Sequence, residues 1–296
     1  MLNKTKHNMS LRRSESCAAY AFLLPWLVGL VLFTAYPFLN SLYLSFTDAT
    51  VAKASFIGLH NYIELLTDDG RFIKSLINTT KYAVISVPLK LAFALFVAIL
   101  LKNGRTFYRT VYYIPSIIGG SIAVAVMWRQ MFSMEGVFNA ALAWFHVPPR
   151  EWLGHPDYAL SILILLAVWQ FGSSMVIFIG GLKNIPNELY EAASIDGAGK
   201  FHSFFNITLP MLSPTIHLIL QLIGAFQVFT QGYIITQGGP MDETLFTVHY
   251  IYEMGFKSVR LGYASAASWV LLALIAVVAG VVFFTSKYWV FYENEK

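Results

Sequence analysis

The chain has 296 residues, of which 57% are hydrophobic and 12% are charged. Soluble domains carry about 25% charged residues, so the composition excludes an ordinary water-soluble protein and indicates that the lipid bilayer is the solvent. The net charge of +4 is modest and bears on membrane orientation more than on a nucleic-acid partner. The single cysteine, Cys17, excludes an intramolecular disulfide and a cysteine-based metal site.

Six stretches are long and apolar enough to cross a bilayer as helices, which takes about 20 predominantly apolar residues. They cover residues 18–38, 76–101, 111–132, 158–182, 213–236 and 261–284. The first follows a basic N-terminal stretch, as the core of a signal peptide would, but the apolar run from Cys17 to Leu44 is too long for one. We therefore predict an all-α integral membrane protein with six transmembrane helices and a retained first span.

The lysines and arginines of the connecting segments are distributed unevenly, and cytoplasmic segments are enriched in these residues. One side carries Lys4, Lys6, Arg12, Arg13, Lys102, Arg105, Arg109, Lys183, Lys200, Lys287 and Lys296, whereas the other carries Lys53, Arg71, Lys74, Arg150, Lys257 and Arg260. This bias predicts that both termini are cytosolic. The resulting organisation is a cytosolic segment (1–17), a transmembrane domain (18–285) with a cytosolic loop at 183–212, and a cytosolic tail (286–296).

All 16 acidic residues lie outside the six predicted spans. Ion- and proton-coupled carriers usually keep an Asp or Glu within the membrane as the coupling site, so this distribution argues against a secondary transporter. Lys81 and Arg129 fall near span ends, where long basic side chains reach the interface. Lys90 is nearer the middle of its span and must face the protein interior or a wet cavity. A pore-lining position and a purely structural contact both fit it.

Polar uncharged and aromatic side chains are concentrated in the fourth and fifth spans. The candidates for substrate contact are Trp169, Gln170 and Ser173 in the fourth, and Phe226, Gln227, Thr230, Gln231 and Tyr233 in the fifth. Gln227, Thr230 and Gln231 are spaced i, i+3 and i+4, which predicts a shared helical face. Aromatic rings with amides and hydroxyls suit a sugar. Hydrogen bonding between helices explains the same residues at least as well, so both interpretations stand.

Catalytic and metal-binding motifs are missing from the sequence. The seven histidines show no H-E-x-x-H or other ligand spacing, and no G-x-S-x-G motif occurs. No G-x-x-x-x-G-K-[ST] phosphate-binding loop occurs either, since Gly199-Lys200 is followed by Phe201. We therefore predict neither an enzyme nor a metal site, and any ATP that powers the protein would be hydrolysed on another chain.

The loop 183–212 is a polar segment between two long apolar spans. Pro186 suits the first turn of a helix over 187–195, and Asn184 and Asn187 are alternative caps. Asp196-Gly197 would end that helix, because glycine is free to take a positive φ. A second helix over 198–208 would lead to Leu209-Pro210.

The helix predicted over 187–195 places Leu189, Ala192 and Ala193 on one face, because they are spaced i, i+3 and i+4. The small alanines allow another surface to approach this face closely. Such a helix suits a helix-in-groove contact. An ordinary loop helix with no partner would show the same pattern.

One pattern in this loop resembles the EAA loop of binding-protein-dependent ABC importer permeases. It consists of Glu191-Ala192-Ala193, Gly197, Ile207 and Leu209-Pro210 at the family's spacing. The fuller string 188–198 resembles the carbohydrate branch of that family. Five further segments of this chain also resemble that branch. They are Tyr36-Pro37, Ser45-Phe46-Thr47, Phe56–Tyr62, Tyr113-Ile114-Pro115 and Gly238-Gly239-Pro240. The resemblance covers nearly the whole chain and is closest to the maltose F-type and glycerol-3-phosphate A-type subunits, without the extra N-terminal helices and large outer loop of the maltose subunit.

The resemblance implies a type I ABC importer permease fold in a multi-pass protein of the bacterial cell membrane. It also implies a heterodimer with a second homologous permease subunit, a cytosolic ATPase dimer that holds ATP and Mg, and an extracytoplasmic solute-binding protein. No cofactor is expected on this chain. The residues expected to couple it to the ATPase are Glu191, Ala192, Ala193, Asp196, Gly197, Ile207, Leu209 and Pro210.

The leading hypothesis is therefore a permease subunit that forms half of the pore of an ATP-driven sugar importer, with an oligosaccharide as the expected solute. The alternative is an importer of another polyol-like solute, such as glycerol-3-phosphate or a glycerophosphodiester. A phosphorylated solute would favour basic pore groups, of which Lys90 is the candidate. A membrane-embedded glycosyltransferase would need paired carboxylates or a metal site, and the sequence shows neither.

Overall fold

The computed structural model describes residues 19–212 and 215–288, which are helical over most of their length. The predicted cytosolic segment 1–17, the start of the fifth span at 213–214 and residues 289–296 of the tail lie outside this part. Three helices are long and apolar enough to cross a membrane unaided. They are Ala19–Ser45, α4 (Gly70–Leu101) and Leu261–Tyr288, which consists mainly of α15 (Leu261–Thr285).

The other three predicted spans are interrupted. α5 (Thr106–Ile118) and α6 (Ile122–Met131) meet at 96°, and α8 (Pro156–Trp169) and α9 (Gly172–Asn184) meet at 44°. The fifth predicted span, 213–236, is interrupted after α13 (Thr215–Phe226). A separate bend of 75° lies between α13 and Lys200–Met211, which belongs to the predicted loop 183–212. Counting each bent pair as one span gives six, in agreement with the sequence. The continuous helix predicted over 213–236 is wrong, however, because α13 ends at Phe226.

Shorter elements connect these spans. They are α2 (Tyr36–Ser45) with the π-turn η1 (Val31–Ala35) in the first span, α3 (His60–Thr67), α7 (Val137–Ala143), α10 (Asn187–Ile195), α11 (Lys200–Ser203), η2 (Phe204–Thr208), α12 (Leu209–Met211), η3 (Gly232–Thr236), α14 (Thr247–Tyr252), η4 (Glu253–Lys257) and η5 (Ser286–Tyr288). The described residues contain no strand beyond an isolated bridge between Thr47 and Phe56.

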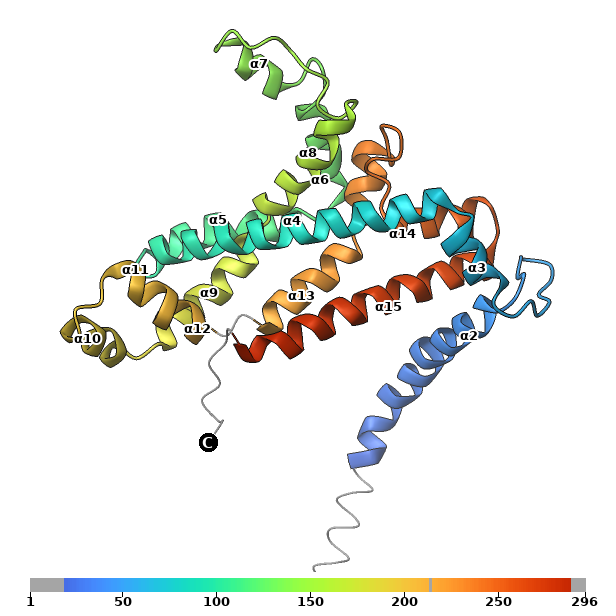
Figure 1. Cartoon of the computed structure of the whole chain (residues 1–296), viewed down its shortest axis with the longest axis horizontal. Helices are drawn as coiled ribbons and strands as arrows, with labels where there is room; N and C mark the ends of the chain where they lie inside the picture. Colours follow the sequence, from blue (N-terminus) through green and yellow to red (C-terminus); the bar gives the residue numbers. More distant parts are fainter. Residues whose placement is uncertain (1–18, 213–214, 289–296) are drawn as a thin grey trace, which may run out of the picture.

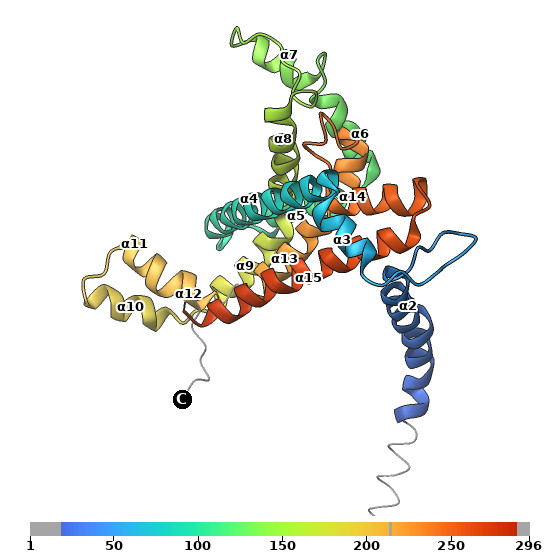
Figure 2. The same ribbon diagram turned by 45° about the vertical axis from the view of Figure 1, so that its right-hand side comes forward.

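The central helix of the bundle is α4, which packs against α8, α9 and α13. α15 runs alongside it and contacts α13, while the α10–α12 hairpin lies at one end of the bundle (Figures 1 and 2). Ala83, Ala94 and Ala98 of α4 are fully buried. Such small side chains let the neighbouring helix backbones approach closely, as helix contacts in membranes require.

The first span packs less than the others. Of its most apolar window, 0% is buried within this chain. It is attached near its outer end, where the Phe38 and Trp269 rings lie 4.8 Å apart and the Trp269 indole N–H donates to Ser41 Oγ at 3.2 Å. A helix-length apolar surface is therefore left for lipid or for another subunit.

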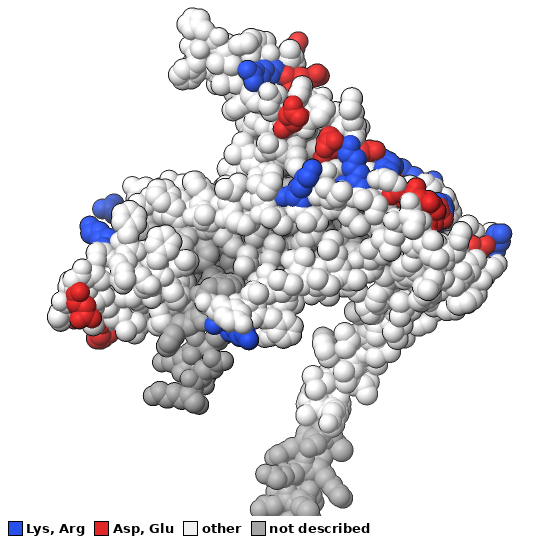
Figure 3. All heavy atoms as spheres, viewed as in Figure 1, with Lys and Arg blue, Asp and Glu red and all other residues white. Residues whose placement is uncertain are grey.

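Charged side chains gather at the two ends of the molecule and leave an uncharged band between them (Figure 3). At the end formed by the predicted outer loops, Arg71 bridges Asp242 at 2.9 Å and Glu253 at 2.8 Å. Lys74 pairs with Glu243 at 2.8 Å. These ion pairs hold the start of α4 against the segment that follows η3.

The prediction that every acidic residue lies outside the spans needs one correction. α8 begins at Pro156, so the acidic Asp157 falls in the first turn of this helix.

Asp69 begins α4 and fixes its outer end. Its carboxylate accepts hydrogen bonds from the Phe72 N–H at 2.8 Å, from the Tyr263 hydroxyl at 2.8 Å and from the Tyr250 hydroxyl. Burial acts to raise the pKa of Asp69, but the bonds from Tyr250, Phe72 and Tyr263 outweigh it and hold the pKa below its usual value. The ionised carboxylate thus caps α4 and joins it to α14 and α15.

Gly262 sits where α15 begins against the end of the first span. A Cβ added there would overlap the Thr47 carbonyl oxygen and lie 2.9 Å from the Ala49 nitrogen. The Gly262 N–H also donates to the Ala49 carbonyl at 3.0 Å. Because both neighbours are backbone atoms, they cannot move aside without disturbing the outer loop.

Gly262→Ala is therefore expected to lower the free energy of unfolding by about 1–3 kcal/mol, the usual cost of overpacking. Thermal unfolding in detergent measures the effect. Gly280→Ala is the matched control, because it lies on the same helix with no atom within 4 Å of an added Cβ. Equal melting temperatures for the two variants would contradict this account of the packing.

Candidate functional site

The interruptions in the three broken spans meet at one cavity of about 410 Å³. Gly120 lies in the turn between α5 and α6, Gln170 at the end of α8, and Gln227–Phe229 in the break after α13. Within a membrane, irregular backbone is tolerated only where it is buried in protein or lines a wet cavity. The shared cavity therefore explains how three spans can be broken.

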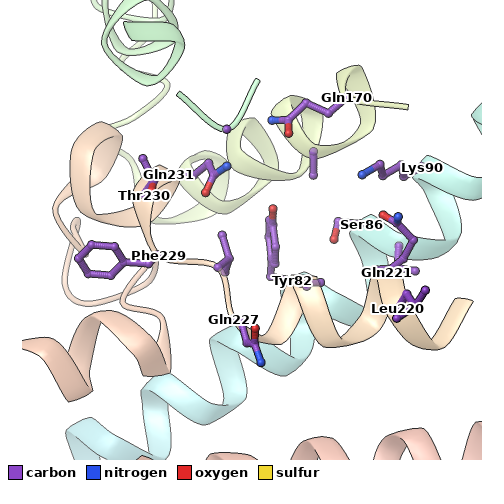
Figure 4. A pocket seen from close by; sticks show the side chains of 16 residues that line it. Tyr82, Ser86, Lys90, Gln170, Leu220, Gln221, Gln227, Phe229, Thr230 and Gln231 are labelled. Atoms are coloured by element: carbon purple, nitrogen blue, oxygen red, sulfur yellow. The ribbon is translucent and has the colours of Figure 1, made fainter. Parts of the chain in front are cut away.

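The lining of this cavity is mostly amide, hydroxyl and small apolar groups. Its sixteen residues are Tyr82, Ser86, Val87, Lys90, Gly120, Ala167, Gln170, Leu220, Gln221, Gly224, Ala225, Gln227, Val228, Phe229, Thr230 and Gln231. In Figure 4 the Tyr82 hydroxyl, the Lys90 ammonium and the Gln170 amide extend into the same space, whereas the Phe229 ring points away from it. Such groups exchange hydrogen bonds with a polyhydroxylated ligand.

Hydrogen bonds tie two of the interruptions together. The Gln170 Nε2 donates to the Gly119 carbonyl at 3.2 Å, and the Ser116 hydroxyl donates to the Gln170 carbonyl at 3.0 Å. The Ser173 N–H in turn donates to Ser116 Oγ at 2.9 Å. Polar backbone groups released by the bend in α8–α9 are thus satisfied by the corner between α5 and α6, so the two bends form one unit.

The cavity contains five of the nine residues predicted for substrate contact, namely Lys90, Gln170, Gln227, Thr230 and Gln231. Trp169, Ser173, Phe226 and Tyr233 do not line it. The Trp169 ring packs 5.6 Å from Trp128, and Ser173 bonds to Ser116 through its backbone. Phe226 is only 1% exposed, in a cluster with Leu271.

The shared helical face predicted for Gln227, Thr230 and Gln231 is wrong, because the helix stops before Gln227. The physical reason is an aromatic cluster beyond the break. The Phe229 and Tyr233 rings stack at 5.1 Å, and both pack 5.4 Å from Tyr252. These contacts hold the segment after the break against the end of α14 and override the continuation of the helix.

Sequence reasoning named Lys90 but missed the two other residues of α4 that form the same wall of the cavity. Tyr82, Ser86 and Lys90 all lie on α4 and line the cavity. Their spacing of four residues places them on one helical face, a pattern that is visible in the sequence. For Lys90, the pore-lining interpretation is the one that fits. The part of the chain that the structure describes gives it no hydrogen bond or ion pair.

The predicted coupling helix is present as α10, Asn187–Ile195, with the predicted bounds. Gly197 follows it with φ of +80°, as predicted. The Gly197 N–H donates to the Ser194 carbonyl at 3.1 Å and the Ala198 N–H to the Ala193 carbonyl at 2.8 Å. This double hydrogen bond is the Schellman ending of a helix, which requires a left-handed residue at the glycine position.

Two details of the loop differ from the prediction. The cap of α10 is Pro186 in an extended conformation, and neither Asn184 nor Asn187 caps it. The second helix starts at Lys200 and continues beyond 208 to Met211. It passes Pro210 because the π-turn η2 lets the Leu209 N–H bond to the Phe204 carbonyl. Proline then follows directly at a position where no N–H donor is needed.

The coupling residues divide into an anchored set and an exposed set. Ile207 and Leu209 pack against buried Leu182 and Ile185 of the bundle. Glu191, Ala192, Asp196 and Gly197 are exposed, Ala193 and Pro210 half-buried.

Beside the exposed set lie Ile195 and Phe201, which are 86% and 83% exposed. Large exposed apolar groups next to polar ones mark interaction surfaces. Within residues 19–212 and 215–288, no ion pair engages Glu188, Glu191 or Asp196. The hairpin therefore presents an unsatisfied surface beside its anchored base.

A profile of the protein family described as "Binding-protein-dependent transport system inner membrane component" matches residues 70–291. The chain belongs to this family. Its relatives include "Probable ABC transporter permease protein YesP" of Bacillus subtilis (strain 168), 46% identical over 98% of this chain and 97% of the relative. "Arabinooligosaccharides transport system permease protein AraP" of the same organism is 32% identical over 90% of this chain and 87% of its own. "Lactose transport system permease protein LacF" of Rhizobium radiobacter is 31% identical over 96% and 98%.

Solved structures share the fold. A chain of the bacterial alginate ABC transporter, in complex with an alginate pentasaccharide-bound periplasmic protein, matches with a TM-score of 0.80 at 22% identity. The match covers 93% of this chain and 96% of that one. The type I ABC importer permease fold, the multi-pass membrane character and the resemblance to carbohydrate-type permeases are thus confirmed. The chain is a transport component rather than an enzyme.

Removing polar groups from the cavity should impair transport without disturbing the fold. Gln227→Ala combined with Thr230→Ala is expected to lower solute uptake by the assembled transporter by about five- to 150-fold, since each of the two lost hydrogen bonds is worth about 0.5–1.5 kcal/mol. Basal ATP hydrolysis should not change. Gln130→Ala is the control, because Gln130 is exposed on α6 outside the cavity lining. Normal uptake by the double variant would assign Gln227 and Thr230 a structural role.

Proposed function

We propose that this family member is one of two pore-forming subunits of an ATP-driven oligosaccharide importer. The observation that carries the proposal is the meeting of three interrupted spans at a cavity lined by amides and hydroxyls. In transporters, substrate sites lie near the middle of the bilayer, where discontinuous helices expose backbone and side-chain polar groups. Relatives whose names refer to arabinooligosaccharides and lactose support a sugar as the solute.

The second candidate solute is a phosphorylated polyol, such as glycerol-3-phosphate or a glycerophosphodiester. A phosphate monoester carries about −1.5 to −2 charges at neutral pH. The described lining offers one cation, Lys90, against four glutamines at positions 170, 221, 227 and 231. This balance of amides over cations favours hydroxyl recognition and hence a sugar.

The partners follow from surfaces that this chain leaves open. The first span offers an apolar helix face to a second homologous permease subunit or to lipid. On the opposite side from the hairpin, an extracytoplasmic solute-binding protein would deliver the sugar. The proposed topology places segment 1–17, the loop 183–212 and the tail 286–296 in the cytosol, in keeping with the excess of lysine and arginine there.

The α10 hairpin is the proposed docking element for a separate ATPase, which would hold ATP and Mg. Glu191, Ala192, Ala193, Asp196 and Gly197 would contact the ATPase, while Ile207, Leu209 and Pro210 would fix the hairpin to the bundle. When ATP closes the ATPase dimer, the two coupling helices of the heterodimer would approach each other. The pore would then shift toward its outward-facing state, because ATP binds the closed state more tightly.

Movement of the hairpin can reach the cavity through direct packing. Ile207 and Leu209 contact the cluster formed by α4 and α9, which includes Ala94, Phe178 and Leu182. Lys90 and Ser86 of the same α4 line the cavity. The Tyr190 hydroxyl also bonds to Thr208 Oγ1 at 2.9 Å and fixes α10 to η2. One stiff helix therefore joins the proposed docking surface to the proposed solute site.

Gly197→Val should separate the docking role from folding. A β-branched residue is strained at φ of +80°, and left-handed backbone costs about 1–2 kcal/mol even for ordinary residues. We expect at least fivefold less ATPase to co-purify with the variant, with membrane insertion unchanged. Gly199→Val is the matched control, since its φ is −72° and neither glycine has an atom within 4 Å of an added Cβ. Undiminished co-purification of Gly197→Val would rule out the docking role of α10.

The purified chain alone is expected neither to bind nor to hydrolyse ATP, since its sequence holds no phosphate-binding loop. Nucleotide binding by fluorescence and phosphate release from the isolated subunit in detergent measure this. The complex with its ATPase is the positive control. Hydrolysis that stays with the pure subunit through successive purification steps would contradict a separate ATPase.

A further inference from the structure

Lys90 is the one charged side chain among the sixteen that line the central cavity. It lies on α4 about 17 Å from the helix's C-terminal end, at about 1.5 Å per residue. That is roughly half of the 30 Å thickness of the hydrocarbon layer. Across residues 19–212 and 215–288, no carboxylate pairs with it, and no carboxylate lines the cavity.

A lone ammonium at this depth is costly, and ionisable side chains within membranes face cavities and mark substrate pathways. The other polar groups of the lining are neutral amides and hydroxyls. With Lys90 protonated, the described lining therefore carries one positive charge, which acts over a longer range in a low-dielectric surrounding than in water. A solute that brings one negative charge to Lys90 removes this cost, whereas a neutral solute leaves it.

We propose that the solute is an acidic oligosaccharide and that Lys90 binds a sugar carboxylate. The inference rests on the proposed import function and names the substrate class of the same cavity. At the point of contact, a carboxylate brings one negative charge to Lys90, while a phosphate monoester would bring about −1.5 to −2 charges. The amides of Gln170, Gln221 and Gln231 then serve the hydroxyls of the sugar, and Lys90 distinguishes acidic from neutral sugars.

The test uses the complete importer, with its binding protein and ATPases, in proteoliposomes. The probes are trigalacturonate, the neutral galactotriose of the same linkage and glycerol-3-phosphate. For each probe, uptake by Lys90→Gln is divided by uptake by the unmodified importer, so that the binding protein's own selectivity cancels. Trigalacturonate uptake should fall at least tenfold and galactotriose uptake less than twofold. Lys90→Arg should retain at least a third of trigalacturonate uptake, since it keeps the charge.

Lys81→Gln is the matched control. Lys81 lies nine residues earlier on α4, about half a turn out of phase with Lys90, and is exposed away from the cavity lining. The importer with Lys81→Gln should transport all three probes as well as the unmodified importer does.

Two outcomes would contradict the carboxylate contact without contradicting sugar import. One is uptake of galactotriose but not of trigalacturonate by the unmodified importer, and the other is an equal loss of uptake of both sugars in Lys90→Gln. Dependence on Lys90 for glycerol-3-phosphate only would replace the carboxylate by a phosphate. No uptake of either sugar, with ATP hydrolysis intact, would contradict the proposed import function itself.

Discussion

The structure depends on one constraint, which is that backbone N–H and C=O groups in hydrocarbon must find partners within the protein. Three spans are interrupted, and each interruption releases such groups. All three meet at one polar cavity, and at two of them the released groups bond to side chains of the other, as between Ser116 and Gln170. The cavity and the bends therefore depend on each other. The bends supply polar groups to the cavity lining, and the polar cavity allows the bends to exist within the membrane.

The same arrangement links the two ends of the molecule. α4 remains one continuous 32-residue helix, whereas the neighbouring spans are broken. Its outer end is capped by Asp69 and held by the ion pairs of Arg71, its middle lines the cavity, and its inner end packs with the base of the α10 hairpin. Small buried side chains such as Ala94 and Ala98 leave little room for independent sliding. In the proposed mechanism, this packing would pass a displacement of the hairpin to the cavity.

Local features were predictable from the sequence, and features fixed by tertiary contacts were not. The bounds of α10 follow from Pro186 and Gly197, whose backbone preferences act within one turn. The six spans follow from apolar length. The break after Phe226 could not be foreseen, because residues 227–229 contain no proline or glycine and the stacking of Phe229 on Tyr233 fixes the break. Gln227, Thr230 and Gln231 consequently do not share one continuous helical face, although all three line the cavity.

Charge distribution distinguishes what this chain satisfies by itself from what it leaves to partners. In the described residues, ion pairs join the outer loops, as between Arg260 and Glu64 at 2.9 Å. The acids of the α10 hairpin have no such partner in the same part of the chain, and neither has Lys90 in the cavity. Unpaired charges on the exposed hairpin cost little, because water screens them. Lys90 is different, since the membrane gives it no such screening. The charge of Lys90 is therefore explained best by the proposed acidic solute, which would bind to it transiently during transport.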